Sequence, residues 1–112
     1  MESYYDPADF AKFSADGFGS YNPELWEKAM AFYGAAHADD ALTAREKALI
    51  SLGVAAAIQC PYCIDAYTNT CLQMGCDEKQ IGEVFHVAAA IRVGAVLAHG
   101  LQAMKIIEDQ EL

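Results

Sequence analysis

The sequence predicts an all-α protein, and three observations lead to this fold class. Apolar residues recur at helical spacing over most of the chain. Typical N-terminal caps precede four of these periodic segments. Stretches that alternate polar and apolar residues are missing, and so is an Asn-Gly turn, so nothing in the sequence indicates a strand. With 112 residues, the chain should form a single domain, residues 1–112, of about six helices.

An Asx residue followed by proline marks the start of each of the first two helices. An Asp-Pro pair occupies residues 6–7 and an Asn-Pro pair occupies residues 22–23. The Asx side chain can accept a hydrogen bond from a free N–H, and proline suits the first helical position because it has no N–H to leave unpaired. We expect one helix over residues 7–15 and a second that begins at Pro23 and fades between Gly34 and His37.

Two capping boxes predict further helices. In this motif the cap side chain and an acid or amide side chain three residues later each satisfy a free backbone N–H. Thr43 and Glu46 form one such pair and predict a helix over residues 44–58, which is apolar on most sides and should be central. Asp77 and Gln80 form the second pair.

A shorter helix should lie between these two, starting at Pro61 and ending at Gly75. With the helix over residues 44–58 it should form a helix hairpin around a pair of cysteines. The last helical region should continue to Met104, with a break near Gly94.

The apolar content of the last region predicts a homo-oligomer. Arg92 and His99 are its strongly polar residues between positions 87 and 101, and a small monomer cannot cover such a helix on all sides. The N-terminal segment is rich in aromatic residues that should pack across a neighbouring surface: Tyr4, Tyr5, Phe10, Phe13 and Phe18. Four further aromatic residues should be core: Trp26, Phe32, Tyr33 and Phe85.

Charge and composition narrow the classes of function. Lys plus Arg number 7 and Asp plus Glu number 16, so the formal net charge is −9, which argues against nucleic acid and anionic membranes as partners. The longest apolar stretch lies near residues 49–58 and is shorter than the ~18 residues of a membrane span. The N-terminus does not resemble a signal peptide, so we expect a cytoplasmic protein.

The C-P-Y-C motif at residues 60–63 is the sharpest chemical feature. Cys60 and Cys63 are three apart, so they share a helix face and their sulfurs can meet. Free N–H groups and the helix dipole at a helix start favour the thiolate. The motif therefore predicts a redox dithiol, in which one thiolate attacks and the other resolves.

Two other interpretations of the cysteines stay open. A CxxC pair can be half of a zinc site, but no second half is present, so we expect neither metal nor cofactor. The cysteines can also be inert and buried. Cys71 should be a core residue, whereas Cys76 follows the helix end and should be partly exposed; a second reactive pair between them is only weakly indicated.

Two stretches resemble the AhpD-like, carboxymuconolactone decarboxylase family, namely LTAREKALI at residues 42–50 and VAAAIQCPYCIDAY at residues 54–67. The resemblance extends over residues 42–104. It implies an all-helical fold and a homotrimer or homohexamer. Members with CxxC are thiol peroxidases that reduce hydroperoxides and are recycled by a dithiol partner, of thioredoxin-like or lipoyl type. The resemblance also implies that Cys63 attacks the peroxide and that Cys60 is the exposed resolving thiol.

The whole chain is similar to peroxidase-like members linked to arsenosugar biosynthesis. This finer resemblance includes residues 2–7, 23–28 and 86–92.

The chain departs from the family pattern at two positions. The family has a histidine four residues after the second cysteine, where this chain has Tyr67, and a glutamate twelve residues before the first, where it has Ala48. The nearest acid, Glu46, completes a capping box and lies ~21 Å from Cys60 along a straight helix. Tyr67 either packs in the core or donates a hydrogen bond to the thiolate. His86 is the preferred substitute base, because the similar subgroup has a histidine in that context.

The remaining histidines are less informative. His37 should lie solvated in a turn, and His99 should be a core residue or a second substitute for the base.

Together these features predict a thiol-dependent oxidoreductase of the alkylhydroperoxidase type. Its partners should be a small-molecule peroxide and a dithiol reductant protein. One alternative is a carboxymuconolactone decarboxylase-type enzyme, which needs a base and an anion site, although the basic residues here are few and scattered. Another is an accessory oligomer that binds a soft ligand such as trivalent arsenic through its thiols.

Overall fold

The computed structural model describes residues 6–111, so Tyr4 and Tyr5 lie outside the described residues. Every regular element between residues 6 and 111 is helical, which confirms the all-α prediction. The elements in chain order are two 3-10 helices, η1 (Pro7–Lys12) and η2 (Phe18–Tyr21), followed by α1 (Pro23–His37), α2 (Ala44–Ile58), α3 (Pro61–Gln73) and α4 (Glu78–Glu111).

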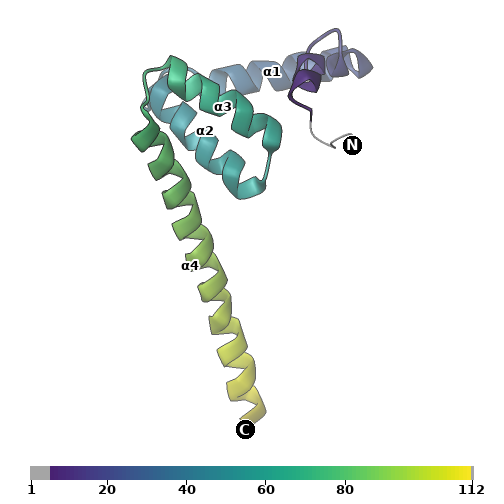
Figure 1. The fold of residues 1–112 in the computed structure, drawn as a ribbon. Coiled ribbons are helices and arrows are strands. Elements are labelled where there is room, and N and C mark those ends of the chain that lie inside the picture. Colours follow the sequence, from purple (N-terminus) through teal and green to yellow (C-terminus); the bar gives the residue numbers. More distant parts are fainter. Residues whose placement is uncertain (1–5, 112) are drawn as a thin grey trace.

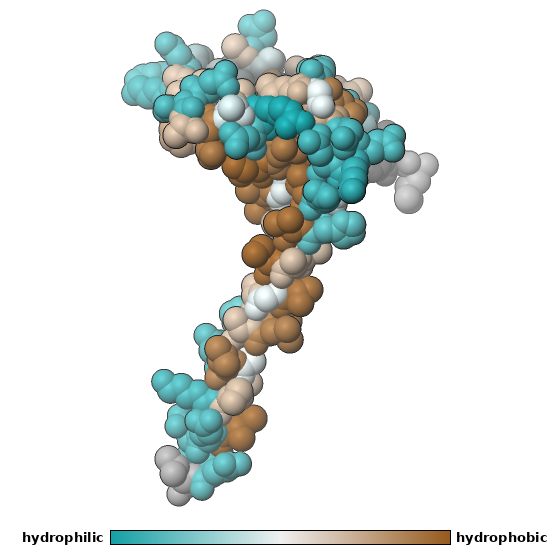
Figure 2. Space-filling model, turned by 90° about the vertical axis from the view of Figure 1, so that its left-hand side faces the viewer, coloured by the Kyte–Doolittle hydropathy of each residue, from teal (hydrophilic) through white to brown (hydrophobic). Residues whose placement is uncertain are grey.

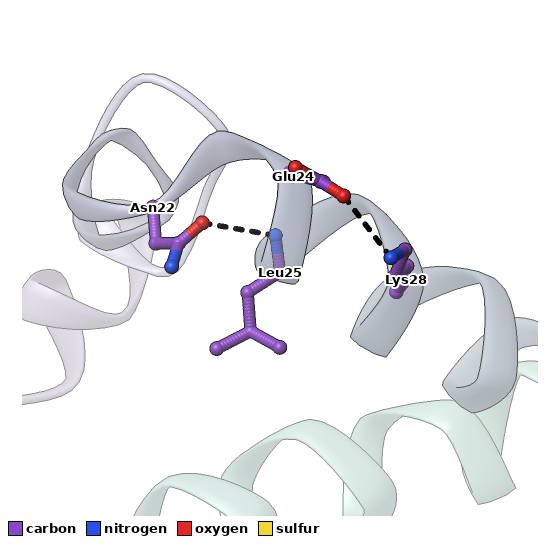
Figure 3. Close-up of polar contacts among 4 residues, drawn as sticks. All are labelled: Asn22, Glu24, Leu25 and Lys28. Carbon is purple, nitrogen blue, oxygen red and sulfur yellow. Dashed lines mark hydrogen bonds and ion pairs between the residues drawn. The ribbon is translucent and has the colours of Figure 1, made fainter.

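The predicted Asx caps are present at the starts of η1 and α1. Asp6 accepts a hydrogen bond from the N–H of Ala8 at 3.0 Å. Asn22 accepts one from the N–H of Leu25 at 3.1 Å (Figure 3). The same figure shows the ion pair between Glu24 and Lys28 near the start of α1. The first helix is nevertheless a 3-10 helix that ends at Lys12, short of the expected residue 15. Forming the first turn of an α-helix is unfavourable, and a segment of six residues adds too few further hydrogen bonds to offset that free energy.

Helices α2 and α3 form a hairpin within the helical cluster, and α2 packs against α1, α3 and α4 (Figure 1). Thr43 and Glu46 make both hydrogen bonds of the capping box, so α2 begins where the sequence predicts. Its end is set by Gln59, which adopts the left-handed conformation with φ 61°. The buried core lies between α2 and α3 and at the turn after α3; its residues are Ala48, Leu52, Ala55, Cys71 and Cys76.

Helix α4 is one continuous helix of 34 residues, which corrects the expected break near Gly94. A single glycine costs a helix only about 1 kcal/mol, and no proline interrupts this segment. Its first turns pack on α2 through Ile81 and Val84, and Arg92 donates to the carbonyl of Ala57. Beyond that point it extends away from the other helices (Figure 1), and residues 89–111 are all exposed.

The chain leaves much apolar surface uncovered. Its radius of gyration is 19.0 Å, whereas a compact chain of this length has a radius of about 13 Å. Phe32 is 78% exposed, Tyr33 43% and Phe85 38%, so the prediction that they are core is wrong for the isolated chain; Trp26 is half-buried. Figure 2 shows apolar side chains gathered along α4 and on the adjoining underside of the helical cluster.

Helix α4 is also long and apolar enough to cross a membrane, judged by length and composition. This corrects the expectation that no segment reaches that length, which considered only uninterrupted apolar stretches. Arg92 and His99 interrupt the run, but a long helix tolerates two such residues within an apolar window. The same length and composition also suit a helix whose faces are covered by protein.

Candidate functional site

The cysteine pair lies at the start of α3. Cys60 is the N-cap residue, and its sulfur accepts a hydrogen bond from the N–H of Cys63 at 3.3 Å. The two cysteines form a disulfide, with their Cα atoms 5.3 Å apart. Both are half-buried. The helix start therefore acts directly on the sulfur of Cys60, because a free N–H near a helix N-terminus stabilises a thiolate.

A cavity of about 400 Å³ opens beside this pair. Most of its lining is aromatic, and it comes from the N-terminal segment, α1 and α3: Phe10, Phe13, Phe18, Tyr33, Tyr62 and Tyr67. Phe10 stacks on Tyr62, the residue between the cysteines, with ring centroids 5.9 Å apart. The aromatic N-terminal segment thus packs on its own chain, over the start of α3.

One ion pair borders the cavity. Lys12 and Asp9 both line it, and their charged groups are 3.0 Å apart. The hydrogen bond that Lys12 donates to Asp9 raises the pKa of Lys12, so the lysine remains charged at neutral pH. Burial raises the pKa of Tyr33 and keeps that phenol protonated. The cation at this cavity is therefore already paired with a carboxylate.

Tyr67 joins the site to a histidine on another helix. It follows Cys63 by one helical turn, and both side chains line the cavity. The hydroxyl of Tyr67 lies 3.1 Å from Nε2 of His37, and their rings stack with centroids 5.5 Å apart. The Tyr67 hydroxyl is thus hydrogen-bonded, not merely packed.

His37 is the last residue of α1 and is half-buried, so the expectation of a solvated turn histidine is wrong. Its Nδ1 lies 2.8 Å from the carbonyl oxygen of Tyr33, and its Nε2 lies 3.0 Å from the hydroxyl of Ser51 on α2. One imidazole therefore links α1, α2 and α3 directly behind the cavity.

The other residues considered as a base lie outside this arrangement. Glu46 is exposed and accepts from the N–H and hydroxyl of Thr43 at 2.9 and 3.0 Å, which lowers its pKa. Ala48 is buried in the core. His86 and His99 are exposed on α4. Within one chain, Tyr67 lines the cavity with the cysteine pair and His37 contacts Tyr67, whereas Glu46 and His86 lie elsewhere.

The second pair of cysteines is buried and free. The expectation that Cys76 is partly exposed is wrong, because Cys76 packs in the core cluster with Leu52 and Cys71. Its N–H also donates to the carbonyl of Cys71 at 2.9 Å. Burial and the neighbouring Cys76 raise the pKa of Cys71, which favours an unreactive thiol. Among residues 6–111, no group of three or more His, Cys, Asp or Glu side chains is placed to hold a metal.

Sequence reasoning missed the cavity and the role of His37. His37 lies thirty positions before Tyr67, and no spacing rule connects residues on separate helices. The one local signal was a histidine at a helix end, beside a tyrosine four residues earlier.

Comparison with known proteins relates most of the chain to one family. The model of the carboxymuconolactone decarboxylase family matches residues 23–105. A Paracoccus denitrificans protein, known as uncharacterized protein 4 in cox locus, is 39% identical over 72 residues, which cover 64% of this chain. The chain matches 65% of the length of that relative.

Two solved structures share the fold. A protein from Methanobacterium thermoautotrophicum superimposes with a TM-score of 0.70 at 32% identity, covering 72% of this chain and 91% of the other. An apo carboxymuconolactone decarboxylase family protein from Legionella pneumophila gives a TM-score of 0.69 at 28% identity, covering 76% of this chain and 75% of the other.

Proposed function

This chain belongs to the carboxymuconolactone decarboxylase family, and from that premise we propose that it is a thiol-dependent oxidoreductase of the alkylhydroperoxidase type. The observation that carries the proposal is the cysteine pair at the start of α3, which can close into a disulfide beside an aromatic cavity. A dithiol that can close in this way supplies the two electrons that a peroxide reduction requires.

The two cysteines have separate roles in this proposal. The Cys63 thiolate attacks the distal peroxide oxygen, the O–O bond breaks, and the sulfur becomes a sulfenic acid. Cys60 then condenses with that sulfenic acid and releases water. The backbone N–H that bonds the Cys60 sulfur favours its thiolate, which is the form that reacts. A dithiol partner, thioredoxin-like or lipoyl-type, reduces the disulfide.

The cavity favours an organic hydroperoxide with an apolar body. Its lining is mostly aromatic, and its volume of about 400 Å³ suits a small organic molecule. A dicarboxylate would instead need unpaired cations. Lys12 is the one basic residue among those that line this cavity, and it is paired with Asp9. These features favour peroxidase chemistry over the decarboxylase alternative.

We also propose a homotrimer or homohexamer in a reducing compartment such as the cytoplasm. Exposed apolar residues along α4 support assembly, and the −9 charge disfavours anionic membranes and nucleic acid. A reducing compartment would supply the dithiol partner.

The proposal is tested by single-turnover reduction of cumene hydroperoxide. The reduced protein should consume one equivalent of peroxide and lose two thiols, and peptide mapping should find them joined as Cys60–Cys63. Cys63→Ser should abolish consumption, whereas Cys60→Ser should stop at a sulfenic acid that dimedone traps. Cys71→Ser serves as the matched control and should react like the natural protein.

Unchanged peroxide and thiol content would contradict the proposal. Arsenite that binds with a stoichiometry of one per cysteine pair, without any peroxide turnover, would instead support the soft-ligand alternative.

A further inference from the structure

We propose that His37, acting through the hydroxyl of Tyr67, accepts the proton of the Cys63 thiol. This inference rests on the peroxidase function proposed above and identifies the base for it. A base is needed because the N–H at the helix start bonds the sulfur of Cys60 and leaves Cys63 without that stabilisation. A cysteine thiol with a pKa near ~8.5 is mostly protonated at neutral pH.

Tyr67 is the residue that would connect Cys63 with His37. Tyr67 lies one turn after Cys63 on α3, so the two side chains share a helix face, and both line the cavity. From the Tyr67 hydroxyl, Nε2 of His37 is 3.1 Å away. In the proposed path, the reduced Cys63 thiol approaches this hydroxyl, and the proton crosses from α3 to α1 through it.

The hydrogen-bond partners of His37 determine which nitrogen can accept a proton. Its Nδ1 faces the carbonyl oxygen of Tyr33 at 2.8 Å, and a carbonyl only accepts, so Nδ1 carries the hydrogen. In the neutral ring, Nε2 is then the acceptor, and Tyr67 is the donor beside it. While the Tyr67 hydroxyl donates its hydrogen to His37, its oxygen still has lone pairs that can accept a proton from another group.

Ser51 provides a partner for the charged ring. Its hydroxyl donates to the carbonyl of Lys47 at 2.8 Å, so its oxygen is left to accept from Nε2 of His37 at 3.0 Å. His37 thus has a hydrogen-bond partner in both protonation states. A residue that accepts and returns a proton needs this property, because a buried polar group left without a partner is unfavourable in either protonation state.

Proton transfer comes before the attack on the peroxide. The thiol proton of Cys63 passes to the Tyr67 oxygen while the Tyr67 proton passes to Nε2 of His37, which leaves a thiolate and an imidazolium. The thiolate attacks the hydroperoxide, the O–O bond breaks, and the departing alkoxide takes the proton back along the same path. The Cys63 sulfenic acid and the Cys60 thiol then form the disulfide and water, and the dithiol partner returns two electrons and two protons.

The test measures the ionisation of Cys63 without peroxide. The reduced protein is alkylated with iodoacetamide across pH, and the modification of Cys60 and Cys63 is followed separately by peptide mass spectrometry. Near neutral pH, Tyr67→Phe and His37→Gln should each slow alkylation of Cys63 by ~10-fold or more, which corresponds to one pKa unit. The difference should vanish at high pH, where the thiol ionises without help.

A double variant distinguishes a relay from two separate effects. Because both residues lie on one path, Tyr67→Phe combined with His37→Gln should be no slower than either single variant. Tyr21→Phe and His99→Gln are matched controls on exposed side chains and should leave the rate unchanged. Lys47, whose ammonium donates to the carbonyl of Ala38 next to His37, remains in every variant. The other ionisable groups that line the cavity also remain: Asp9, Lys12, Tyr33, Cys60 and Tyr62.

Three results would contradict the proposed role of His37 and Tyr67. Unchanged alkylation in the single variants, equal slowing of Cys60 and Cys63, or multiplied effects in the double variant would overturn it. If His37→Gln fails to fold, Tyr67→Phe carries the test, since it removes one hydroxyl and keeps the ring. If the natural protein shows the expected alkylation pattern but consumes no peroxide, the peroxidase function fails and the assignment of His37 stands.

Discussion

Tyr67 shows how the role of one residue depends on its partners in space. A tyrosine is a poor base at neutral pH, so the sequence alone indicates packing or a simple hydrogen bond. In the fold its hydroxyl meets His37, while its side chain lines the same cavity as the cysteines. The chemistry of the position therefore depends on two side chains and not on one.

Cys71 provides a prediction at the same scale, about pH. Burial and Cys76 raise its pKa above the ordinary value of 9.0, so the folded protein holds this proton more tightly than the unfolded chain. Below pH 9.0 the thiol is protonated in both states and has no effect. As pH rises through 9.0, the unfolded chain releases the proton first, so the free energy of unfolding should fall.

Urea unfolding of the reduced protein between about pH 8 and 9.5 checks this prediction against Cys71→Ala. The natural protein should lose stability more steeply over that interval than the variant does. Equal slopes would show that the Cys71 thiol does not resist ionisation.

Capping residues account for most of the helix starts. Thr43 with Glu46 and Asp77 with Gln80 each make both reciprocal hydrogen bonds, so the helices begin where the sequence predicts. These motifs are local, which is why they can be found without a structure. The length of α4 was harder to predict, because Gly94 is a weak signal and the helix runs on through it.

Gly75 gives a prediction at the scale of the element. It ends the turn after α3 with φ +84°, a conformation that costs other residues about 1–2 kcal/mol. Gly75→Ala should therefore lower the free energy of unfolding by about 1 kcal/mol. Gly34→Ala is the matched control, because it lies inside α1 with open space around it, and it should raise stability by about 0.5–1 kcal/mol.

Thermal or urea unfolding of both variants measures the difference. A stabilising Gly75→Ala would mean that the turn relaxes to a negative φ without loss.

The whole molecule presents an apolar helix that one chain does not cover. Exposed apolar residues lie around most of α4, as its turn of about 3.6 residues places them. One half of the helix surface has Val87, Leu97, Leu101, Met104, Val93, Val96 and Ile107, and the opposite side has Ile91 and Ile106. A helix that is apolar on more than one side requires more than one neighbour. This favours further copies of the chain around α4, in agreement with the proposed trimer or hexamer.

Leu97→Glu tests this assembly. An uncompensated charge in an apolar interface costs about 3–5 kcal/mol, so the substitution should weaken association by ~100-fold or more. Sedimentation equilibrium at micromolar concentration should find the natural protein as an oligomer and the variant as smaller species. Lys105→Glu, which replaces a residue that is already charged, is the control and should assemble normally.

A natural protein that sediments only at 12.1 kDa would contradict the assembly. A protein that needs detergent to leave the membrane fraction would show instead that lipid covers α4.

The sequence by itself determined the helical class, the start of each α-helix and the position of the cysteine pair. Each of these depends on residues within one or two turns of each other, so local spacing is enough to reveal them. Only the tertiary structure decided that Phe10 covers Tyr62, that Cys76 is buried and that His37 meets Tyr67. Those contacts join residues on separate elements, and they form only when the burial of apolar surface brings the elements together.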